Sequence, residues 1–69
     1  MLSYDEFNRL IRTKVKEHST VSEDEEILVI YQSSALNVQK GVGFDGIKFF
    51  VVTYENSTAT VDIYEKTTL

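Results

Sequence analysis

The stretch GVGFDGIKFFVVTY, residues 41–54, contains all three glycines of the 69-residue chain and three of its four phenylalanines. Its first six residues match G-x-G-x-x-G, a pattern that cradles a nucleotide phosphate when a helix follows it. Here the segment that follows is typical of a strand. A kinase-type glycine loop does lie between strands, but 69 residues are too few for the other catalytic elements that it requires. The pattern therefore does not predict a phosphate loop.

Asp45-Gly46 instead predicts a hairpin turn. Asp-Gly between two alternating segments is a strong signal for a two-residue turn with positive φ. Gly41 and Gly43 would then lie in a short strand, or at bulges where the chain bends or another backbone comes close. Both interpretations stay open for residues 38–44.

The N-terminal segment predicts a helix. Ser3-Tyr4-Asp5-Glu6 is a capping box, in which the side chains of the first and last residues bond to each other's amides. Apolar residues then recur at spacings of three and four as far as Val15. Acidic residues in the first turn and lysines in the last suit the helix dipole. We expect a helix over residues 4–17 that packs through one face.

Strands are predicted by runs rich in β-branched and aromatic residues. These runs cover residues 26–33, 47–54 and 59–66, with 38–44 as a further candidate. Asn56-Ser57-Thr58 matches the N-glycosylation pattern and is interpreted as a turn in the hairpin between the last two strands. The sequence thus predicts one α+β domain, residues 1–69, with an N-terminal helix packed on a three- to four-stranded antiparallel β-meander.

Composition excludes several classes of function. The net charge is −4, and residues 19–69 carry eight acidic and three basic side chains, so nucleic-acid binding is not expected. No apolar run is long enough to span a bilayer, and the N-terminus does not resemble a secretory signal, which favours a cytoplasmic protein of a bacterial host. A chain this small without cysteine often gains stability by self-association, so a homodimer is favoured.

The sequence predicts neither an enzyme nor a metal or cofactor site. His18 is the only histidine and follows the predicted helix, where the helix dipole would stabilise its charged form. Nothing in the sequence brings a serine to it as a hydrolase would need. The acidic run lacks the spacing and glycine of a calcium loop and is interpreted as a solvated, charged handle for a basic protein surface. Its members are Glu23, Asp24, Glu25 and Glu26.

The aromatic strand predicts an interface. Side chains of residues 47–54 alternate between two faces, and a single helix can cover only one of them. The uncovered face would leave an apolar patch in water, which usually marks a binding surface. The residues assigned to that face are Phe50, Val52, Tyr54, Tyr64 and Tyr31.

From Glu26 onward the chain resembles a family of small uncharacterised proteins from phages and prophages of Gram-positive bacteria. The resemblance covers roughly 40 residues. Its matching positions are Leu36, Asn37, Gln39, Lys40, Asp45-Gly46, Thr53-Tyr54 and Tyr64 to Lys66. It implies no catalytic residues, since no activity is known for the family, but it implies an accessory protein that binds a host or phage protein.

Three hypotheses follow. The first is a non-enzymatic inhibitor or modulator that binds a protein, of unknown identity, through the exposed sheet face or the acidic loop. The second is a protein that sequesters a nucleotide-like ligand at a homodimer interface, with aromatic side chains stacking and Lys40 or Lys48 meeting phosphate. The third is an acidic mimic of nucleic acid.

Overall fold

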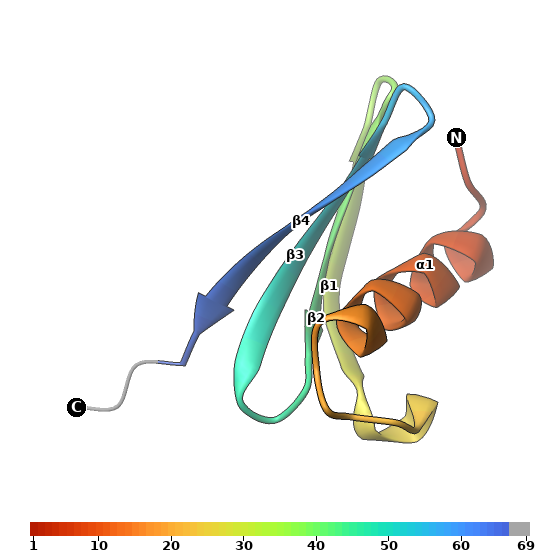
Figure 1. Cartoon of the computed structure of the whole chain (residues 1–69). Coiled ribbons are helices and arrows are strands. Elements are labelled where there is room, and N and C mark those ends of the chain that lie inside the picture. Colours follow the sequence, from red (N-terminus) through yellow and green to blue (C-terminus); the bar gives the residue numbers. More distant parts are fainter. Residues whose placement is uncertain (67–69) are drawn as a thin grey trace.

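The computed structural model describes residues 1–66 and contains one helix laid across a four-stranded antiparallel sheet (Figure 1). The sheet order is β1-β2-β3-β4, a simple meander, which confirms the predicted α+β fold. The elements are α1 (Tyr4–Glu17), a 3₁₀ turn (Asp24–Glu26), β1 (Leu28–Ala35), β2 (Val38–Phe44), β3 (Lys48–Glu55) and β4 (Thr58–Glu65). The uncertain segment 38–44 is thus a full strand, and the other strands lie within two residues of their predicted bounds.

Helix α1 begins at the predicted capping box and buries one stripe. The Ser3 amide donates to Glu6 Oε1 at 2.8 Å, and the Glu6 amide donates to Ser3 Oγ at 3.1 Å. These bonds satisfy two amides that a helix start leaves without partners. The buried residues of the helix, one per turn, are Phe7, Ile11 and Val15. The helix therefore contributes its apolar stripe to the core, and its polar side faces solvent.

The two glycines of β2 explain where the helix rests. A side chain at Gly43 would place its Cβ 2.8 Å from Val15 Cγ2 and 2.9 Å from Ile11 Cγ2, and one at Gly41 would collide with Ile11 Cδ1. The missing side chains leave a trough on one face of the sheet, and the apolar stripe of α1 fills it. Of the two alternatives left open for these glycines, the structure shows the strand: both lie in β2, and their nearest neighbours are side chains of the helix.

The register of the sheet determines which residues lie under the helix. Gly43 pairs with Phe50 and Gly41 pairs with Val52. Since paired residues in an antiparallel ladder point to the same face, both β3 side chains share the helix side with the glycines. Both are fully buried. The core thus lies between α1 and the middle strands.

Two side chains tie the flanking segments to this core. The Arg12 guanidinium donates to the carbonyl oxygens of Asp24 and Ile27 at 2.6 and 2.7 Å, and it also donates to Asn8. It thereby holds the loop after the helix against the helix. At the other end, the buried Gln39 amide accepts from the Leu2 amide at 3.0 Å and donates to the Leu2 carbonyl at 2.9 Å. Strand β2 thus anchors the chain before the helix.

The turn between β2 and β3 differs from the prediction in length. Three residues, Asp45 to Ile47, connect the strands instead of two, and Gly46 takes the predicted positive φ of 97°. Asp45 Oδ1 accepts from the amides of Ile47 and Lys48, each at 2.8 Å, and Asp45 Oδ2 accepts from the Ser19 hydroxyl. A carboxylate in place of a backbone carbonyl closes this turn, which accounts for the extra residue.

Asp45 should make the stability of the protein depend on pH. Burial opposes its ionisation, but the hydrogen bonds from Ser19 and from the two turn amides outweigh burial and hold the pKa of Asp45 below its usual value. A lowered pKa in the folded state stabilises the protein above the unfolded pKa of about 3.9, and this stabilisation is lost as the pH falls through the lower, folded-state value. We expect Asp45→Asn to lower the unfolding free energy by about 1 kcal/mol at neutral pH.

Urea unfolding followed by circular dichroism checks this expectation. The difference between wild type and Asp45→Asn should stay constant above about pH 5 and shrink as the pH falls below about 4. A Glu25→Gln variant is the control, because its exposed side chain makes no hydrogen bond with the turn. A difference for Asp45→Asn that is the same at low and neutral pH would contradict the assigned role of the carboxylate.

Candidate functional site

The face of the sheet opposite the helix, here called the open face, is not covered by any other element of residues 1–66 (Figure 1). Pairing across all four strands places its residues in rows. The first row is Leu28, Phe44, Phe49 and Tyr64, and the second is Tyr31, Val42, Val51 and Asp62. The apolar members of these two rows form one continuous area, which we call the aromatic patch. It occupies the half of the open face nearest the turn between β2 and β3.

Several side chains of the aromatic patch are exposed to solvent. Tyr31 is 59% exposed, Tyr64 57% and Leu28 56%. At the centre of the patch the rings of Phe44 and Phe49 stack, with centroids 4.6 Å apart and planes inclined by 24°. Stacking shields these two rings only in part. A contiguous apolar area of this kind on a small protein marks a binding surface more often than a scattered set of exposed residues does.

The predicted interface residues divide between the two faces. Tyr31 and Tyr64 lie on the open face as predicted, but the assignment of Phe50, Val52 and Tyr54 to that face is wrong. The first two are core residues with no exposed surface, and Tyr54 packs against the core on the same side. The reason is the glycine trough of β2, which draws the helix to the face that carries Phe50. Sequence reasoning therefore missed Phe44 and Phe49, the centre of the patch.

The four acidic residues of the predicted handle do not act as one group. The Asp24 carboxylate meets Lys16 Nζ at 3.0 Å, so it is part of the contact between the loop and the helix. Its three neighbours are exposed, and they are Glu23, Glu25 and Glu26. Because β1 begins at Leu28, these carboxylates lie at the end of the sheet where the first row of the aromatic patch begins.

The arrangement around His18 is not that of a hydrolase. The residue ends the helix, and its amide donates to the Val15 carbonyl. Ser19 donates its hydroxyl directly to Asp45, whereas a catalytic serine would donate to a histidine base. A shallow hollow of about 600 Å³ adjoins both residues. Within residues 1–66, no group of three or more His, Asp or Glu side chains is placed to hold a metal ion.

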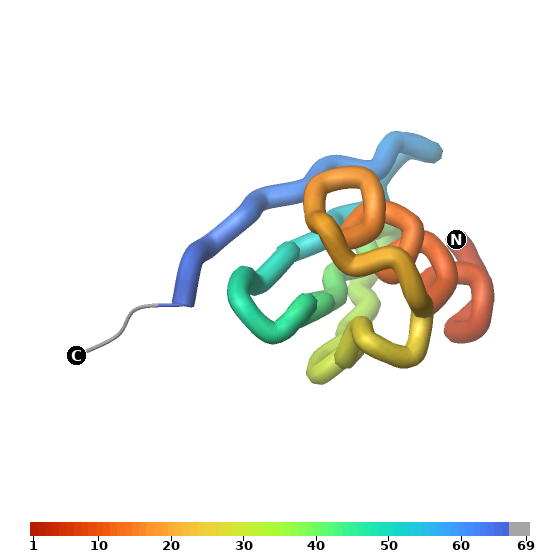
Figure 2. Tube along the Cα trace, turned by 60° about the horizontal axis from the view of Figure 1, so that its bottom comes forward, coloured from red at the N-terminus to blue at the C-terminus, as the bar shows by residue number. Residues whose placement is uncertain are grey.

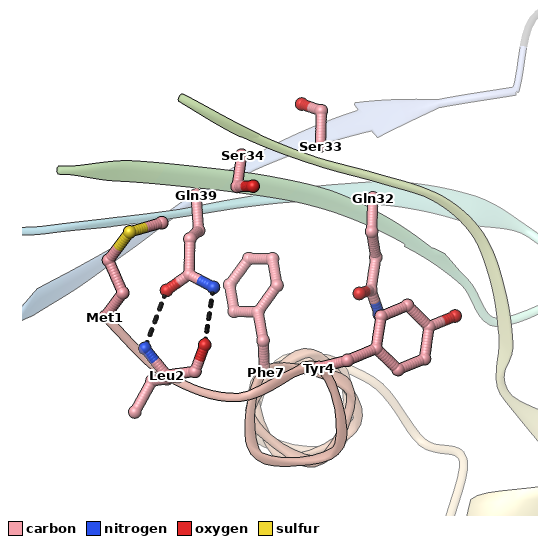
Figure 3. A pocket seen from close by; sticks show the side chains of 8 residues that line it. All are labelled: Met1, Leu2, Tyr4, Phe7, Gln32, Ser33, Ser34 and Gln39. Carbon is pink, nitrogen blue, oxygen red and sulfur yellow. Dashed lines mark hydrogen bonds between the residues drawn. The ribbon is translucent and has the colours of Figure 1, made fainter. Parts of the chain in front are cut away.

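A second hollow, of about 370 Å³, lies beside the start of the helix (Figure 3). Gln39 forms one wall and is occupied by its two bonds to Leu2. The side-chain nitrogen of Gln32 points toward the same region, is buried, and has no hydrogen-bond partner among the described residues. Because this nitrogen has almost no accessible surface, a ligand in the hollow could not reach it without movement of the protein. The hollow lies where the N-terminal segment packs against the sheet.

The two lysines proposed for phosphate binding lie on opposite faces of the sheet. Lys40 shares the open face with Thr53, whereas the Nζ of Lys48 lies 5.9 Å from the centre of the Phe50 ring on the helix side. One ligand on the aromatic patch could therefore meet Lys40 but not Lys48. This separation weakens the hypothesis of a nucleotide-like ligand.

Comparison with known proteins identifies no relative. The chain matches no protein-family model, and no curated protein or solved structure is detectably similar to it. Within the described residues, no helix is both long and apolar enough to cross a membrane.

Proposed function

We propose that this chain is a small, non-enzymatic accessory protein of the phage type that binds another protein through its open face, as an inhibitor or modulator. The observation that carries the proposal is the aromatic patch, in which two stacked phenylalanines are flanked by the exposed rings of Tyr31 and Tyr64. Tyrosine and phenylalanine are enriched at the centres of protein interfaces, because each buries a large area at low cost in side-chain entropy. The resemblance to phage proteins supports an accessory role.

The charges around the patch indicate the chemistry of the partner. Asp62 lies in the second row of the open face, next to Val51, and is exposed. The exposed residues Glu23, Glu25 and Glu26 precede β1 in the chain, and Leu28, the first residue of β1, begins the first row. By contrast, residues 1–18, mostly the helix on the other side of the molecule, carry four basic and three acidic side chains. The Asp62 edge of the patch thus fits an apolar protein surface that carries a lysine or arginine, a residue that also interacts well with aromatic faces.

The experiment compares three immobilised proteins: wild type, the double variant Tyr31→Ser/Tyr64→Ser, and Tyr4→Ser. Tyr4 is 67% exposed at the start of the helix, so its variant controls for the loss of an exposed aromatic residue away from the open face. Each protein is exposed to a lysate of Gram-positive bacteria, and retained proteins are compared by mass spectrometry. We expect a protein that wild type and Tyr4→Ser retain equally and the double variant retains at least about tenfold less, an effect typical of losing interface anchors.

Salt provides the second criterion. Because the Asp62 carboxylate borders the patch, retention should weaken as the ionic strength rises from about 0.05 to 0.5 M. The proposal fails if the same proteins bind to all three baits, or if only the Tyr4→Ser variant loses binding. It also fails if the retained protein carries an acidic surface and binds more tightly in high salt.

A further inference from the structure

Strand β4 forms one edge of the sheet and lies beyond the cover of the helix. Figures 1 and 2 show β4 curving away from α1, which lies over the other three strands. On the helix side of β4, Val61 is partly buried, but Ile63 is 44% exposed. On the other side, Tyr64 is exposed as well. The C-terminal half of this strand therefore presents apolar side chains on both faces.

The backbone of β4 also presents unpaired polar groups. The Lys66 amide donates to the Ile47 carbonyl at 3.3 Å, so it points toward β3. The ladder between β3 and β4 continues without a shift in register, and amides along a strand point alternately to its two sides. The amides and carbonyls that point away from β3 therefore belong to Ala59, Val61, Ile63 and Glu65, and within residues 1–66 no further strand lies beside them. Such a row of free groups is a template for pairing with another strand.

The opposite edge of the sheet is protected and β4 is not. The register between β1 and β2 shifts between Val29 and Tyr31, which is a β-bulge. A bulge interrupts the row of free groups and twists the edge, one of the ways in which natural proteins block unwanted pairing. Strand β4 has eight residues, no bulge and no proline. It is thus the edge of this sheet that is suited to pairing.

A two-fold axis through β4 allows few registers. With the axis perpendicular to the sheet, the outward-pointing residues must face one another, so odd-numbered residues pair with odd-numbered ones. Pairing Val61 with Ile63 of a second copy would put Asp62 opposite its own counterpart, and these like charges repel. Pairing Val61 with Ala59 of a second copy would leave the C-terminal half of the strand unpaired. Placing Val61 on the axis avoids both problems and sets Asp62 opposite Thr60 of the second copy.

We propose that this protein forms a two-fold homodimer by antiparallel pairing of β4 with β4 of a second copy, with Val61 on the axis. Ala59, Val61 and Ile63 then exchange all their outward backbone hydrogen bonds with the second copy. The exposed Ile63 packs beside Ala59 and Val61 of the second copy on the helix side, which removes apolar surface from water. The bulged β1 edges are left at the two ends, so the assembly closes at two copies.

The dimer would join the two sheets into one, with both open faces on the same side. This inference concerns the edge of the sheet, whereas the proposed function concerns its open face, so either can fail without the other. If both hold, the accessory protein presents two aromatic patches to its target, and two-site binding raises the apparent affinity without any new contact in either site.

Hydrogen exchange on the wild-type protein tests the pairing without any substitution. We expect the amides of Ala59, Val61 and Ile63 to become at least about tenfold more protected as the protein concentration rises from micromolar to millimolar. The amides of Thr60 and Asp62, which point toward β3, should be protected at every concentration and serve as internal controls. Fast exchange of the three outward amides throughout this range, together with a monomer mass by light scattering, would overturn the proposal.

Opposite charges at one position test the register. Thr60→Asp would place a second carboxylate opposite Asp62 of the second copy on each side of the axis, whereas Thr60→Lys would place an ammonium there. We expect the dimer dissociation constant to rise at least about fivefold in the first variant and to fall at least about fivefold in the second, with the two values converging in about 1 M salt.

The two variants control for each other, because both place a charge at the same exposed site of the monomer. Thermal unfolding at a concentration where both are monomeric checks that each is folded. Equal dissociation constants for the two variants in low salt would overturn the proposed register. A dimer that is broken by Tyr31→Ser but not by Thr60→Asp would place self-association on the open face and overturn the proposal as a whole.

Discussion

Replacing Phe50 by alanine should abolish the folded state or bring it close to its limit of stability, whereas the same change at the neighbouring Phe49 should leave a folded protein. Phe50 has no exposed surface and lies under the helix, opposite Gly43. Removing a buried phenylalanine costs about 3–5 kcal/mol. A domain of this size has a total stability of roughly 3–10 kcal/mol, so the loss takes most of it. Phe49 is on the open face and is partly exposed, so we expect a loss of about 1–2 kcal/mol.

Chemical unfolding monitored by circular dichroism distinguishes the two variants. The pair is well matched, because the residues are identical, adjacent and in the middle of the same sheet. If Phe49→Ala were the more destabilising of the two, the helix would have to lie on the other face of the sheet, and the open face described above would be the core. This outcome would also remove the basis of the proposed function.

The second large effect is expected at Gly43. Its alanine variant should lose about 2–3 kcal/mol of unfolding free energy, because the new methyl group would lie 2.8 Å from Val15 Cγ2 and 2.9 Å from Ile11 Cγ2. Both of these atoms belong to stiff, β-branched side chains and cannot turn away without moving the helix. Gly41→Ala should cost less, since its closest contact is the mobile end of the Ile11 side chain.

A double-mutant cycle provides the specific test. Val15→Ala removes one of the two methyl groups that oppose the new side chain at Gly43. We therefore expect the double variant to be at least about 1 kcal/mol more stable than the sum of the two single losses predicts. Additive losses would show that the methyl group at Gly43 does not meet Val15. The close packing of the helix against β2 described above would then be incorrect.

The helix and the β2–β3 connection could be predicted because short-range chemistry controls both. The capping box at Ser3 and Glu6 and the regular spacing of apolar residues define the helix bounds without reference to the rest of the chain. Gly46 has the positive φ that Asp-Gly favours. The length of this turn was mispredicted, since the Asp45 side chain accepts the bonds that a backbone carbonyl would otherwise accept. When a side-chain oxygen takes the place of a backbone acceptor, the length of the turn changes, although the residues that predict a turn stay the same.

The choice between the two faces of β3 could not be made in the same way. Both faces carry apolar side chains, with Phe49 and Val51 on one and Phe50 and Val52 on the other, so neither is marked as the core by alternation. The G-x-G of β2 does mark the covered face, but it assigns a face to β3 only once the pairing of Gly43 with Phe50 is known. A shift of one residue in that pairing would have placed the glycines beside Phe49.

Local patterns in this sequence are therefore sufficient for its elements, their order and the fold class, because capping, periodicity and turn chemistry act over a few residues. The location of the binding surface is a property of the assembled sheet. Strand register brings Phe44, Phe49, Tyr31 and Tyr64 to one face, and the volume missing at two glycines draws the helix to the other. Register and packing join residues that are distant in the chain, so only the folded molecule determines which aromatic side chains remain in contact with water.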